Sequence, residues 1–340
     1  MVAATAPGSM DIDLMRAAMA AASQVRTSTA PNPWVGAVVA SADGSILATG
    51  ATRPPGGPHA ERVALAAAGD RARGATLVCT LEPCNHHGRT PPCVDGIIDA
   101  GIARVVVGIE DPDPLVAGTG LAALQAAGIE VTVGVAADPV SEQLAPYLVH
   151  RRTGRPYVVL KLAATLDGRT AAPDGTSQWI TGPDARADAH RLRAESQAVL
   201  VGAGTVRADD PSLTVRHVSG PDPLRVVLGR APAGARVHPC LEVSGDLGGV
   251  LDDLGRRGVL QLLVEGGATV AHAFHEAGLV DRYVTYLAPA VFGGDDALAL
   301  FRGPGAPTID AVRRGRFASV SALGDDVRLD LVMVTPEADG

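Results

Sequence analysis

The chain has 340 residues, of which 46% are apolar and 3% aromatic, and its formal net charge is −8. This length favours two domains over a single hydrophobic core. The acidic balance and the scarcity of aromatic rings argue against a nucleic-acid binder, because phosphate contacts need an excess of basic side chains and base stacking needs aromatic platforms.

Predicted helices and strands alternate through the first half of the chain. A helix is predicted over residues 11–25, and the prolines around Asn32 then impose a turn. The predicted elements that follow are a hairpin over 35–40 and 46–49, helices over 60–68, 94–100 and 121–127, and strands over 76–81, 105–109 and 131–135. This alternation predicts a three-layer α/β domain with a mixed sheet. Glycines interrupt the apolar residues 116–137, so no membrane span is predicted there.

One histidine and two cysteines carry the clearest chemistry of the sequence. His59 and Glu61 form an H-x-E segment, and Cys84 and Cys93 follow with eight residues between them. One imidazole and two thiolates leave the fourth position of a tetrahedral zinc open for water, which is typical of catalytic sites. Zinc nucleobase deaminases combine H-x-E with P-C-x-x-C and use the glutamate as a proton carrier, and only the spacing of the second cysteine departs from that pattern here. The sequence therefore predicts a catalytic zinc site.

The predicted helices also bear on this site. His59 opens one helical run, and Pro91-Pro92 places Cys93 at the start of another, where the amides of a helix N-terminus favour a thiolate. Two helix starts are thus expected to face one metal. Taken singly, a His or Cys is more often a core residue than a ligand, and this is the interpretation for Cys79 and Cys240. Four cysteines without a pairing pattern, together with no apolar signal segment, predict a cytoplasmic protein.

A linking helix over 141–152 and a Gly-Arg-Pro segment separate a first domain, residues 1–152, from a second, residues 153–340. Predicted strands and helices also alternate in the second half. The strands are predicted over 157–163, 198–202, 224–228, 260–264, 283–287 and 327–334, and the helices over 184–194 and 268–277.

Two glycine-containing segments of the second half follow predicted strands. Residues 201–205 match a dinucleotide fingerprint only weakly, because no helix is predicted after them. Residues 263–269 run from a strand through two glycines into a helix, which predicts either a phosphate site or a tight turn without a ligand. Arg193, Arg207 and Arg216 are candidates for phosphate binding, although most arginines are only solvated.

Over nearly its whole length the chain resembles the bifunctional deaminase-reductase family of riboflavin biosynthesis. Both halves contribute long matching segments, which are PNPWVG at 31–36, HAE at 59–61, TLEPCNHHGRTPPC at 80–93, KLAATLDGRTA at 161–171, SQWIT at 177–181, ADDPSLTVR at 208–216 and LVEGGATVAHAF at 263–274. The resemblance implies a cytidine-deaminase-like α/β domain followed by a dihydrofolate-reductase-like α/β domain.

The same resemblance implies two activities and two cofactors. Zn²⁺ would serve the hydrolytic deamination of 2,5-diamino-6-(ribosylamino)pyrimidin-4-one 5′-phosphate, a small phosphorylated pyrimidine. NADPH would then reduce the ribosyl group to ribityl. A homo-oligomer is expected, without nucleic-acid or membrane partners.

Carried over by position, the resemblance implies the roles of individual residues. The zinc ligands would be His59, Cys84 and Cys93, with Glu61 as proton shuttle. The first substrate would contact Asn32 and Arg89. The NADP contacts would be Ala163, Trp179, Thr205, Asp209, Gly267, Ala268, Thr269, Val270 and Ala271. The second substrate would contact Ser177, Arg193, Leu213, Arg216 and Glu265. Lys161 and Glu265 are the candidates for a general acid of the reduction.

Asp113 departs from the family, which usually has asparagine at this position, and its carboxylate could repel the substrate phosphate. Two other hypotheses compete with the bifunctional enzyme. A nucleoside or tRNA deaminase with an unrelated accessory domain would need a basic surface or a lone nucleoside pocket, and the net charge argues against it. A zinc-stabilised scaffold would close all four metal positions and would not need Glu61.

Overall fold

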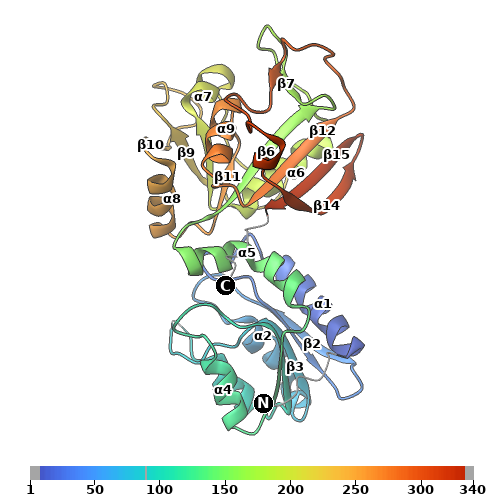
Figure 1. Cartoon of the computed structure of the whole chain (residues 1–340). Helices are drawn as coiled ribbons and strands as arrows, with labels where there is room; N and C mark the ends of the chain where they lie inside the picture. Colours follow the sequence, from blue (N-terminus) through green and yellow to red (C-terminus); the bar gives the residue numbers. More distant parts are fainter. Residues whose placement is uncertain (1–7, 89, 334–340) are drawn as a thin grey trace. The chain divides into compact units, whose positions relative to one another are not determined.

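The computed structural model describes residues 8–88 and 90–333, and the chain divides into two compact units, Met1–Gly154 and Arg155–Gly340 (Figure 1). Each unit is built around its own sheet with helices beside it, so the predicted α/β class is confirmed. None of the described helices is long and apolar enough to cross a membrane.

The first unit contains a mixed five-stranded sheet. Its strands are β1 (Gly36–Ala40), β2 (Ile46–Ala51), β3 (Thr76–Leu81), β4 (Arg104–Ile109) and β5 (Glu130–Val133). They lie in the order β2-β1-β3-β4-β5. The hairpin of β1 and β2 pairs antiparallel with β3, whereas β3, β4 and β5 run parallel. The carboxyl ends of β3 and β4 therefore lie side by side, which is where such sheets place their sites.

Helices cover both faces of this sheet. They are α1 (Ser9–Ser23), α2 (Ala60–Ala68), the 3₁₀ turn η1 (Gly69–Ala72), α3 (Cys93–Asp99), α4 (Thr119–Ala126) and α5 (Ala137–Thr153). Gly36 pairs with Ala51, so the adjacent Gly50 points to the opposite face. A Cβ at Gly36 would overlap the backbone of α1, and one at Gly50 would overlap that of α2. Glycine thus lets one helix pack closely against each face.

The second unit contains an eight-stranded sheet in the order β10-β9-β8-β11-β6-β12-β15-β14. Its strands are β6 (Tyr157–Thr165), β8 (Ala198–Gly202), β9 (Leu224–Leu228), β10 (Leu241–Val243), β11 (Gln261–Val264), β12 (Arg282–Ala288), β14 (Gly315–Leu323) and β15 (Asp326–Met333). The six strands from β10 to β12 are parallel, and β15 and β14 add an antiparallel edge. A separate pair joins β7 (Arg169–Ala171) to β13 (Leu298–Ala299).

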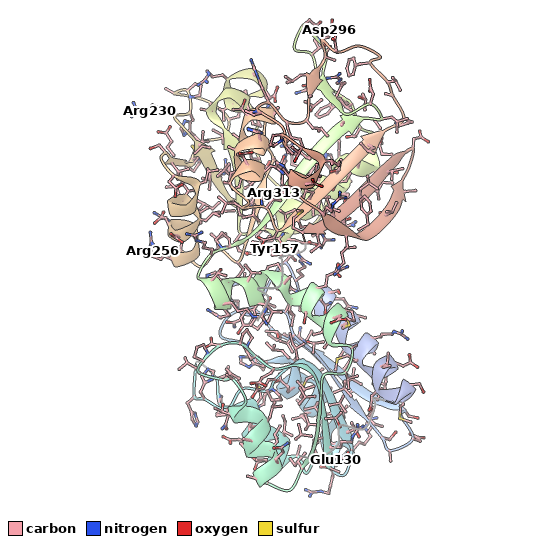
Figure 2. All side chains as sticks on the ribbon, in the orientation of Figure 1. Glu130, Tyr157, Arg230, Arg256, Asp296 and Arg313 are labelled. Carbon is pink, nitrogen blue, oxygen red and sulfur yellow. The ribbon has the colours of Figure 1, made fainter. Side chains whose placement is uncertain are left out.

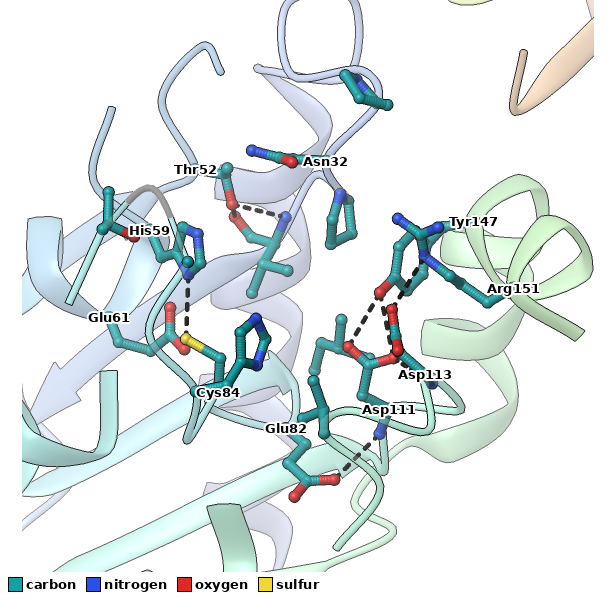
Figure 3. Close-up of a pocket in the computed structure, with 18 of the residues that line it drawn as sticks. Asn32, Thr52, His59, Glu61, Glu82, Cys84, Asp111, Asp113, Tyr147 and Arg151 are labelled. Carbon is teal, nitrogen blue, oxygen red and sulfur yellow. Dashed lines mark hydrogen bonds and ion pairs between the residues drawn. The ribbon is translucent and has the colours of Figure 1, made fainter. Parts of the chain in front are cut away.

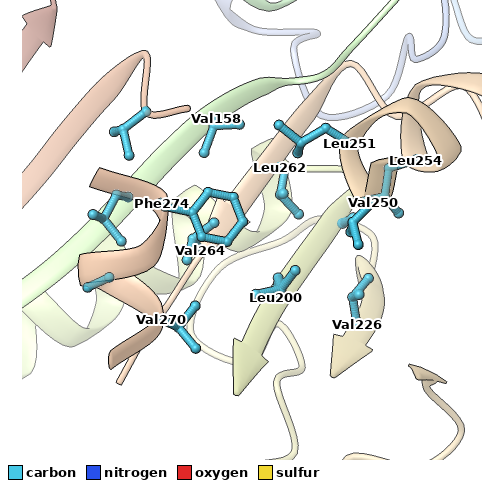
Figure 4. Packing of buried hydrophobic residues seen from close by; sticks show 14 of the residues in the cluster. Val158, Leu200, Val226, Val250, Leu251, Leu254, Leu262, Val264, Val270 and Phe274 are labelled. Carbon is cyan, nitrogen blue, oxygen red and sulfur yellow. The ribbon is translucent and has the colours of Figure 1, made fainter. Parts of the chain in front are cut away.

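The helices of the second unit are α6 (Pro183–Glu195), α7 (Ala203–Asp209), α8 (Leu247–Arg256) and α9 (Ala268–Glu276), with a 3₁₀ turn η2 (Ile309–Ala311). Alternate residues of the central strand β6 face opposite sides of the sheet. Val158, Leu160 and Leu162 belong to the apolar cluster that includes Leu254 of α8 and Phe274 of α9 (Figure 4). Lys161, by the same alternation, faces the other side of the sheet.

Both units are built with few aromatic side chains. Apart from Trp34, Phe274 and Tyr286, the largest fully buried side chains are mostly Leu, as the composition requires. Trp34 is 2% exposed and lies under the guanidinium of Arg26, 5.0 Å from its ring centre. The surface carries exposed charged side chains such as those of Glu130, Arg230 and Arg256, which Figure 2 labels.

Two predictions about the second half are corrected by the structure. The prediction that no helix follows residues 201–205 is wrong, because α7 begins at Ala203 directly after β8. Gly204 lowers the helix propensity of this segment, and contact with β8 and β9 outweighs that cost. The strand β14 is not among the predicted strands: Ala318, Val320 and Ala322 alternate with two serines, but most of its residues are exposed and no long apolar run marks it. Its pairing with β15 stabilises it instead.

Candidate functional site

The predicted metal ligands converge in the first unit. His59 caps α2, Cys84 follows β3, and Cys93 is the first residue of α3. The Nδ1 atom of His59 lies 3.5 Å from the Sγ atom of Cys84 and 3.4 Å from that of Cys93. Ligands at about 2.0–2.3 Å from a tetrahedral zinc have such separations, so the donor set fits this ion. The expectation that two helix starts meet at one metal-binding cluster agrees with this geometry.

Local backbone structure explains why these side chains meet. His59 has an extended conformation, with φ −73° and ψ 166°, immediately before α2 begins. Pro92 cannot donate a backbone hydrogen bond and occupies the position before α3, where no donor is needed. The amide of Cys93 then donates to the Sγ atom of Cys84 at 3.5 Å. The residues between the two cysteines therefore form a loop whose ends are held together.

The electrostatics of the cluster favour a bound cation. Hydrogen bonding to Cys93, and more weakly to His59, lowers the pKa of the Cys84 thiol to about 4 against the effect of burial. The same interaction with Cys84, followed by burial, raises the pKa of Cys93. Hydrogen bonding to Cys84 raises the pKa of His59. Cys84 thus supplies a thiolate, which is the form of cysteine that binds metal.

Glu61 lies beside this cluster and is 3% exposed. Burial, and then the negative charge of Cys84, raise the pKa of its carboxyl, while His59 opposes the change. A carboxyl with a raised pKa is a stronger proton acceptor than an ordinary one. Its place in the first turn of α2, two residues after His59, fixes it next to the three donor atoms.

His59, Glu61 and Cys84 line a cavity of about 320 Å³ in the first unit (Figure 3). Figure 3 shows His59, Glu61 and Cys84 on one side of the cavity and Asp111, Asp113, Tyr147 and Arg151 on the other. Asn32, predicted to contact the substrate, also lines it. Arg89, the other predicted contact, lies outside the described residues.

Four of the residues that line this cavity were not identified from the sequence. They are Glu82, Asp111, Tyr147 and Arg151. Asp111 follows β4, which runs parallel to β3, the strand that precedes Cys84. An acidic residue directly after a parallel strand could therefore have indicated from the sequence that Asp111 lies at the site. Tyr147 and Arg151 belong to α5, which the sequence indicated only as a linking helix.

In the second unit, two predicted substrate contacts bind each other. Arg193 of α6 donates to both carboxylate oxygens of Glu265, at 2.5 and 2.8 Å, and to the carbonyl of Thr214 at 3.1 Å. Both side chains are largely buried. Lys161 lies near this pair, and burial lowers its pKa, opposed by the charge of Glu265 and assisted by that of Arg193. It is the only lysine among the 340 residues.

Arg216 differs from Arg193 because its guanidinium has no carboxylate partner in the described contacts. It donates to the hydroxyls of Ser212 and Thr214 at 2.5 and 3.1 Å and is exposed. The backbone of Arg216 is held by His190, whose Nδ1 atom accepts its amide at 3.2 Å. Burial, followed by the charges of Arg193 and Arg216, lowers the pKa of His190 to about 4, so its ring is neutral near pH 7.

The remaining predicted contacts of the second unit are spread over strand β6, the helices α7 and α9 and the loops between elements. Thr205 of α7 accepts the amide of Gly267 at 2.9 Å, so the two glycine-containing segments meet. Gly267 and Thr269 are exposed at the start of α9, whereas Ala268, Val270 and Ala271 are buried. Trp179 is 70% exposed and lies under the guanidinium of Arg186, whereas Leu213 is 2% exposed. Ala163 and Ser177 are partly buried, and Asp209 is the last residue of α7.

Fold and site together define a zinc deaminase domain joined to a second enzymatic α/β domain, and comparison with known proteins agrees. Residues 9–109 match the zinc-binding region of cytidine and deoxycytidylate deaminases, and residues 156–329 match the RibD C-terminal domain.

Similarity to known proteins extends over most of the chain. The riboflavin biosynthesis protein RibD of Mycobacterium tuberculosis (strain ATCC 25618 / H37Rv) is 43% identical over 328 residues, covering 91% of this chain and 93% of the relative. That of Escherichia coli K12 is 40% identical over 361 residues, covering 94% and 98%. The structure of Acinetobacter baumannii RibD superposes with a TM-score of 0.88 at 38% identity, covering 96% and 99%.

A solved structure from Thermotoga maritima, a diaminohydroxyphosphoribosylaminopyrimidine deaminase/5-amino-6-(5-phosphoribosylamino)uracil reductase, superposes with a TM-score of 0.87 at 35% identity, covering 96% of this chain and 99% of that one. The chain belongs to the RibD family and is a bifunctional enzyme, a zinc-dependent deaminase and an NADPH-dependent reductase. The competing hypothesis of a deaminase with an unrelated accessory domain is not supported.

Proposed function

We propose that the chain removes ammonia from 2,5-diamino-6-(ribosylamino)pyrimidin-4-one 5′-phosphate in its first unit and reduces the ribosyl group of the product in its second. The main support is the cluster of His59, Cys84 and Cys93, whose donor atoms lie within 4.8 Å of one another beside the buried Glu61. A site with three nitrogen and sulfur donors and an adjacent carboxyl suits hydrolysis of an amidine-like ring carbon.

In the first unit, His59, Cys84 and Cys93 would hold the zinc ion, which when bound supplies a Lewis acid that activates water. Glu61 accepts the proton of the attacking water and returns it to the departing nitrogen. One C–O bond forms, one C–N bond breaks, and ammonia leaves. The low exposure of Glu61 keeps bulk water from competing for this proton. Asn32, on the wall of the same cavity, orients the pyrimidine ring.

In the second unit, Arg216 is the residue best placed to bind the substrate phosphate. Arg193 is engaged by Glu265 and Thr214, whereas Arg216 contacts only neutral hydroxyls. The hydroxyls of Ser212 and Thr214 orient its guanidinium, and His190 holds its backbone. A guanidinium without a carboxylate partner can form a bidentate pair with phosphate. Arg193 therefore acts through Glu265, whose carboxylate it fixes for contact with the ribosyl hydroxyls.

Reduction at the ribosyl C1′ atom also requires a proton for the ring oxygen that leaves. Lys161 is our candidate for this general acid, because it lies close enough to the Arg193–Glu265 pair for both of their charges to act on its ammonium group, which brings an N–H donor to the same group of residues. Apart from the histidines, every other basic side chain is an arginine, whose guanidinium does not release a proton near neutral pH. A lysine whose pKa is lowered can release a proton more readily.

NADPH, when bound, supplies the hydride, and the residues present fit this cofactor. Gly267 and Thr269 expose the first turn of α9 at the end of β11, where free backbone amides suit a phosphate group. Thr205 fixes the amide of Gly267, and the exposed Trp179 offers a flat apolar surface. The buried Ala268, Val270 and Ala271 shape this turn. The homo-oligomer and the cytoplasmic location stay predictions.

The test is metal analysis of the purified chain combined with incubation with the diaminopyrimidine ribotide, with and without NADPH. We expect about one zinc per chain. Ammonia release should occur without NADPH, and NADPH oxidation should occur only after ammonia has been released. Ammonia release that persists after complete removal of zinc would overturn the proposal for the first unit. NADPH oxidation on the undeaminated ribotide would contradict the order of the two steps.

A further inference from the structure

The cavity of the first unit is lined by four carboxylates although its proposed substrate is an anion. They are Glu61, Glu82, Asp111 and Asp113. Among the described residues that line it, Arg151 is the sole arginine or lysine. We propose that Arg151 balances the charge of Asp113 so that the cavity accepts a phosphorylated substrate, which makes this ion pair a determinant of substrate specificity. The inference rests on the proposed deamination of a ribotide.

Two of the other carboxylates have dedicated partners. Glu82 accepts four backbone amides, those of Asp111 and Gly118 on one oxygen and those of Gly120 and Leu121 on the other, at 3.0 to 3.3 Å. Asp111 accepts the hydroxyl of Tyr147 at 3.1 and 3.2 Å. These donors spread the negative charge of the two carboxylates over fixed dipoles.

Asp113 depends instead on a full positive charge. Its Oδ2 atom lies 3.4 Å from the Nε atom of Arg151, while its Oδ1 atom accepts the amide of Leu115 at 3.0 Å. The carboxylate of Asp113 is 23% exposed, so it faces any ligand in the cavity. With Arg151 paired to it, the two side chains present no net charge to a phosphate.

The helix α5 holds Arg151 in this position. Tyr147 and Arg151 are four residues apart and therefore neighbours on one face of the helix. The guanidinium of Arg151 lies over the ring of Tyr147, 5.1 Å from its centre, while the hydroxyl of Tyr147 reaches Asp111 (Figure 3). The amide of Asp113 donates to Asp111 at 2.9 Å, which closes a ring of contacts between α5 and the loop after β4.

The experiment is a double-mutant cycle in the full-length zinc-loaded chain, with ammonia release from the ribotide as readout. Arg151→Met leaves Asp113 unpaired and should raise KM about tenfold or more, with a smaller change in kcat. Asp113→Asn keeps the acceptor for the Leu115 amide but releases Arg151 from its carboxylate, so it should lower KM. The double variant should recover most of the lost affinity.

Two further measurements separate charge balance from a structural role. Added salt should lower the KM of Arg151→Met, because it screens repulsion between Asp113 and the phosphate. The substrate without its phosphate should show the same KM with Arg151→Met as with the unchanged chain. Arg152→Met is the matched control, since Arg152 is exposed on the same helix and does not line the cavity.

The outcomes are distinct. If the unchanged chain releases no ammonia from the ribotide, the proposed function fails. If it does, but the double variant is as impaired as Arg151→Met, then Arg151 does not act through Asp113 and the inference is overturned. Equal KM values for all variants would overturn it as well. Zinc content of each variant, held by His59, Cys84 and Cys93, checks that the first unit is folded.

Discussion

The two candidate sites differ in how they balance their charges. In the first unit, His59, Cys84 and Cys93 bring two sulfurs and a nitrogen together, and Glu61 has no basic partner among the described contacts. In the second, Arg193 already neutralises Glu265 through two hydrogen bonds. The first site is therefore completed electrostatically by a cation, whereas the second is balanced internally and leaves Arg216 for an anionic ligand. Independent chemistry in the two units is the expected consequence.

The largest effect is expected for Glu61→Gln, which should break one activity and spare the other. The amide cannot carry a proton, so ammonia release should fall about 10²–10⁴-fold. Zinc content should not change, because Glu61 is not among the three donor residues. NADPH oxidation on deaminated substrate is the internal control. Equal loss of both activities would contradict independent sites.

Lys161→Arg tests the proton donor of the second unit. The guanidinium keeps the positive charge near Glu265 but does not release a proton near neutral pH, so reductase kcat should fall about 10²-fold or more. Ammonia release should be unaffected.

The pH dependence of the reductase sharpens this test. Burial lowers the pKa of Lys161, so the protonated donor disappears as pH rises through a value below the usual one for lysine. Reductase kcat should therefore fall on the alkaline side of its profile, and this limb should be absent from Lys161→Arg. An unchanged limb in the variant would assign it to another group.

Arg216→Ala tests the difference between the two arginines of the second unit. Loss of a charge-assisted pair with phosphate should raise KM for the deaminated ribotide about 10- to 100-fold, while the Kd for NADPH stays the same. Arg230→Ala is the matched control, because Arg230 is 91% exposed and is not among the proposed contacts. An unchanged KM would exclude Arg216 from phosphate binding.

The smallest effect on catalysis is expected for a substitution at Asp281. This substitution tests whether the stability of the two units depends differently on pH. Its Oδ2 atom accepts the amide of Val158 at 2.7 Å, and burial raises its pKa to about 6. Because the folded pKa lies above the unfolded one, the protonated group stabilises the second unit at low pH, and that contribution is lost as pH rises from about 4 to about 6.

Asp281→Asn mimics the protonated form and removes this titration. At pH 7 the variant should be more stable in the second unit by about 2–3 kcal/mol. Hydrogen exchange at pH 4 and pH 7, compared between residues of the two units, measures the effect. A variant that keeps the pH dependence of the unchanged chain would contradict the assignment to Asp281.

Much of the fold could be predicted from the sequence, because most helices and strands are defined by residues that are adjacent in the chain. Strands 198–202 and 224–228 and the helix 60–68 match the structure in their bounds, since each is a continuous apolar or alanine-rich run. The sequence did not predict helix α7, because the packing of this helix against β8 and β9 cannot be seen in local helix propensity. The edge strand β14 was missed for a similar reason, because it is defined by its pairing with β15.

The same contrast applies to the sites. The metal cluster could be predicted because its ligands lie within 35 consecutive residues and their chemistry is specific. Arg151 could not, because α5 reaches the loop after β4 only in the folded unit. Nor could the pairing of Arg193 with Glu265, which joins residues 72 positions apart. Residue type indicates what a side chain can do, but its partner decides which of those possibilities remains.

The two tryptophans of the chain are placed one in each unit, and in opposite surroundings. Trp34 is 2% exposed within the first unit, and Trp179 is 70% exposed in the second, under the guanidinium of Arg186. Indole fluorescence should therefore separate into a blue-shifted and a red-shifted emission, each reporting on one half of the molecule. Events in either half can then be followed spectroscopically without attaching a dye.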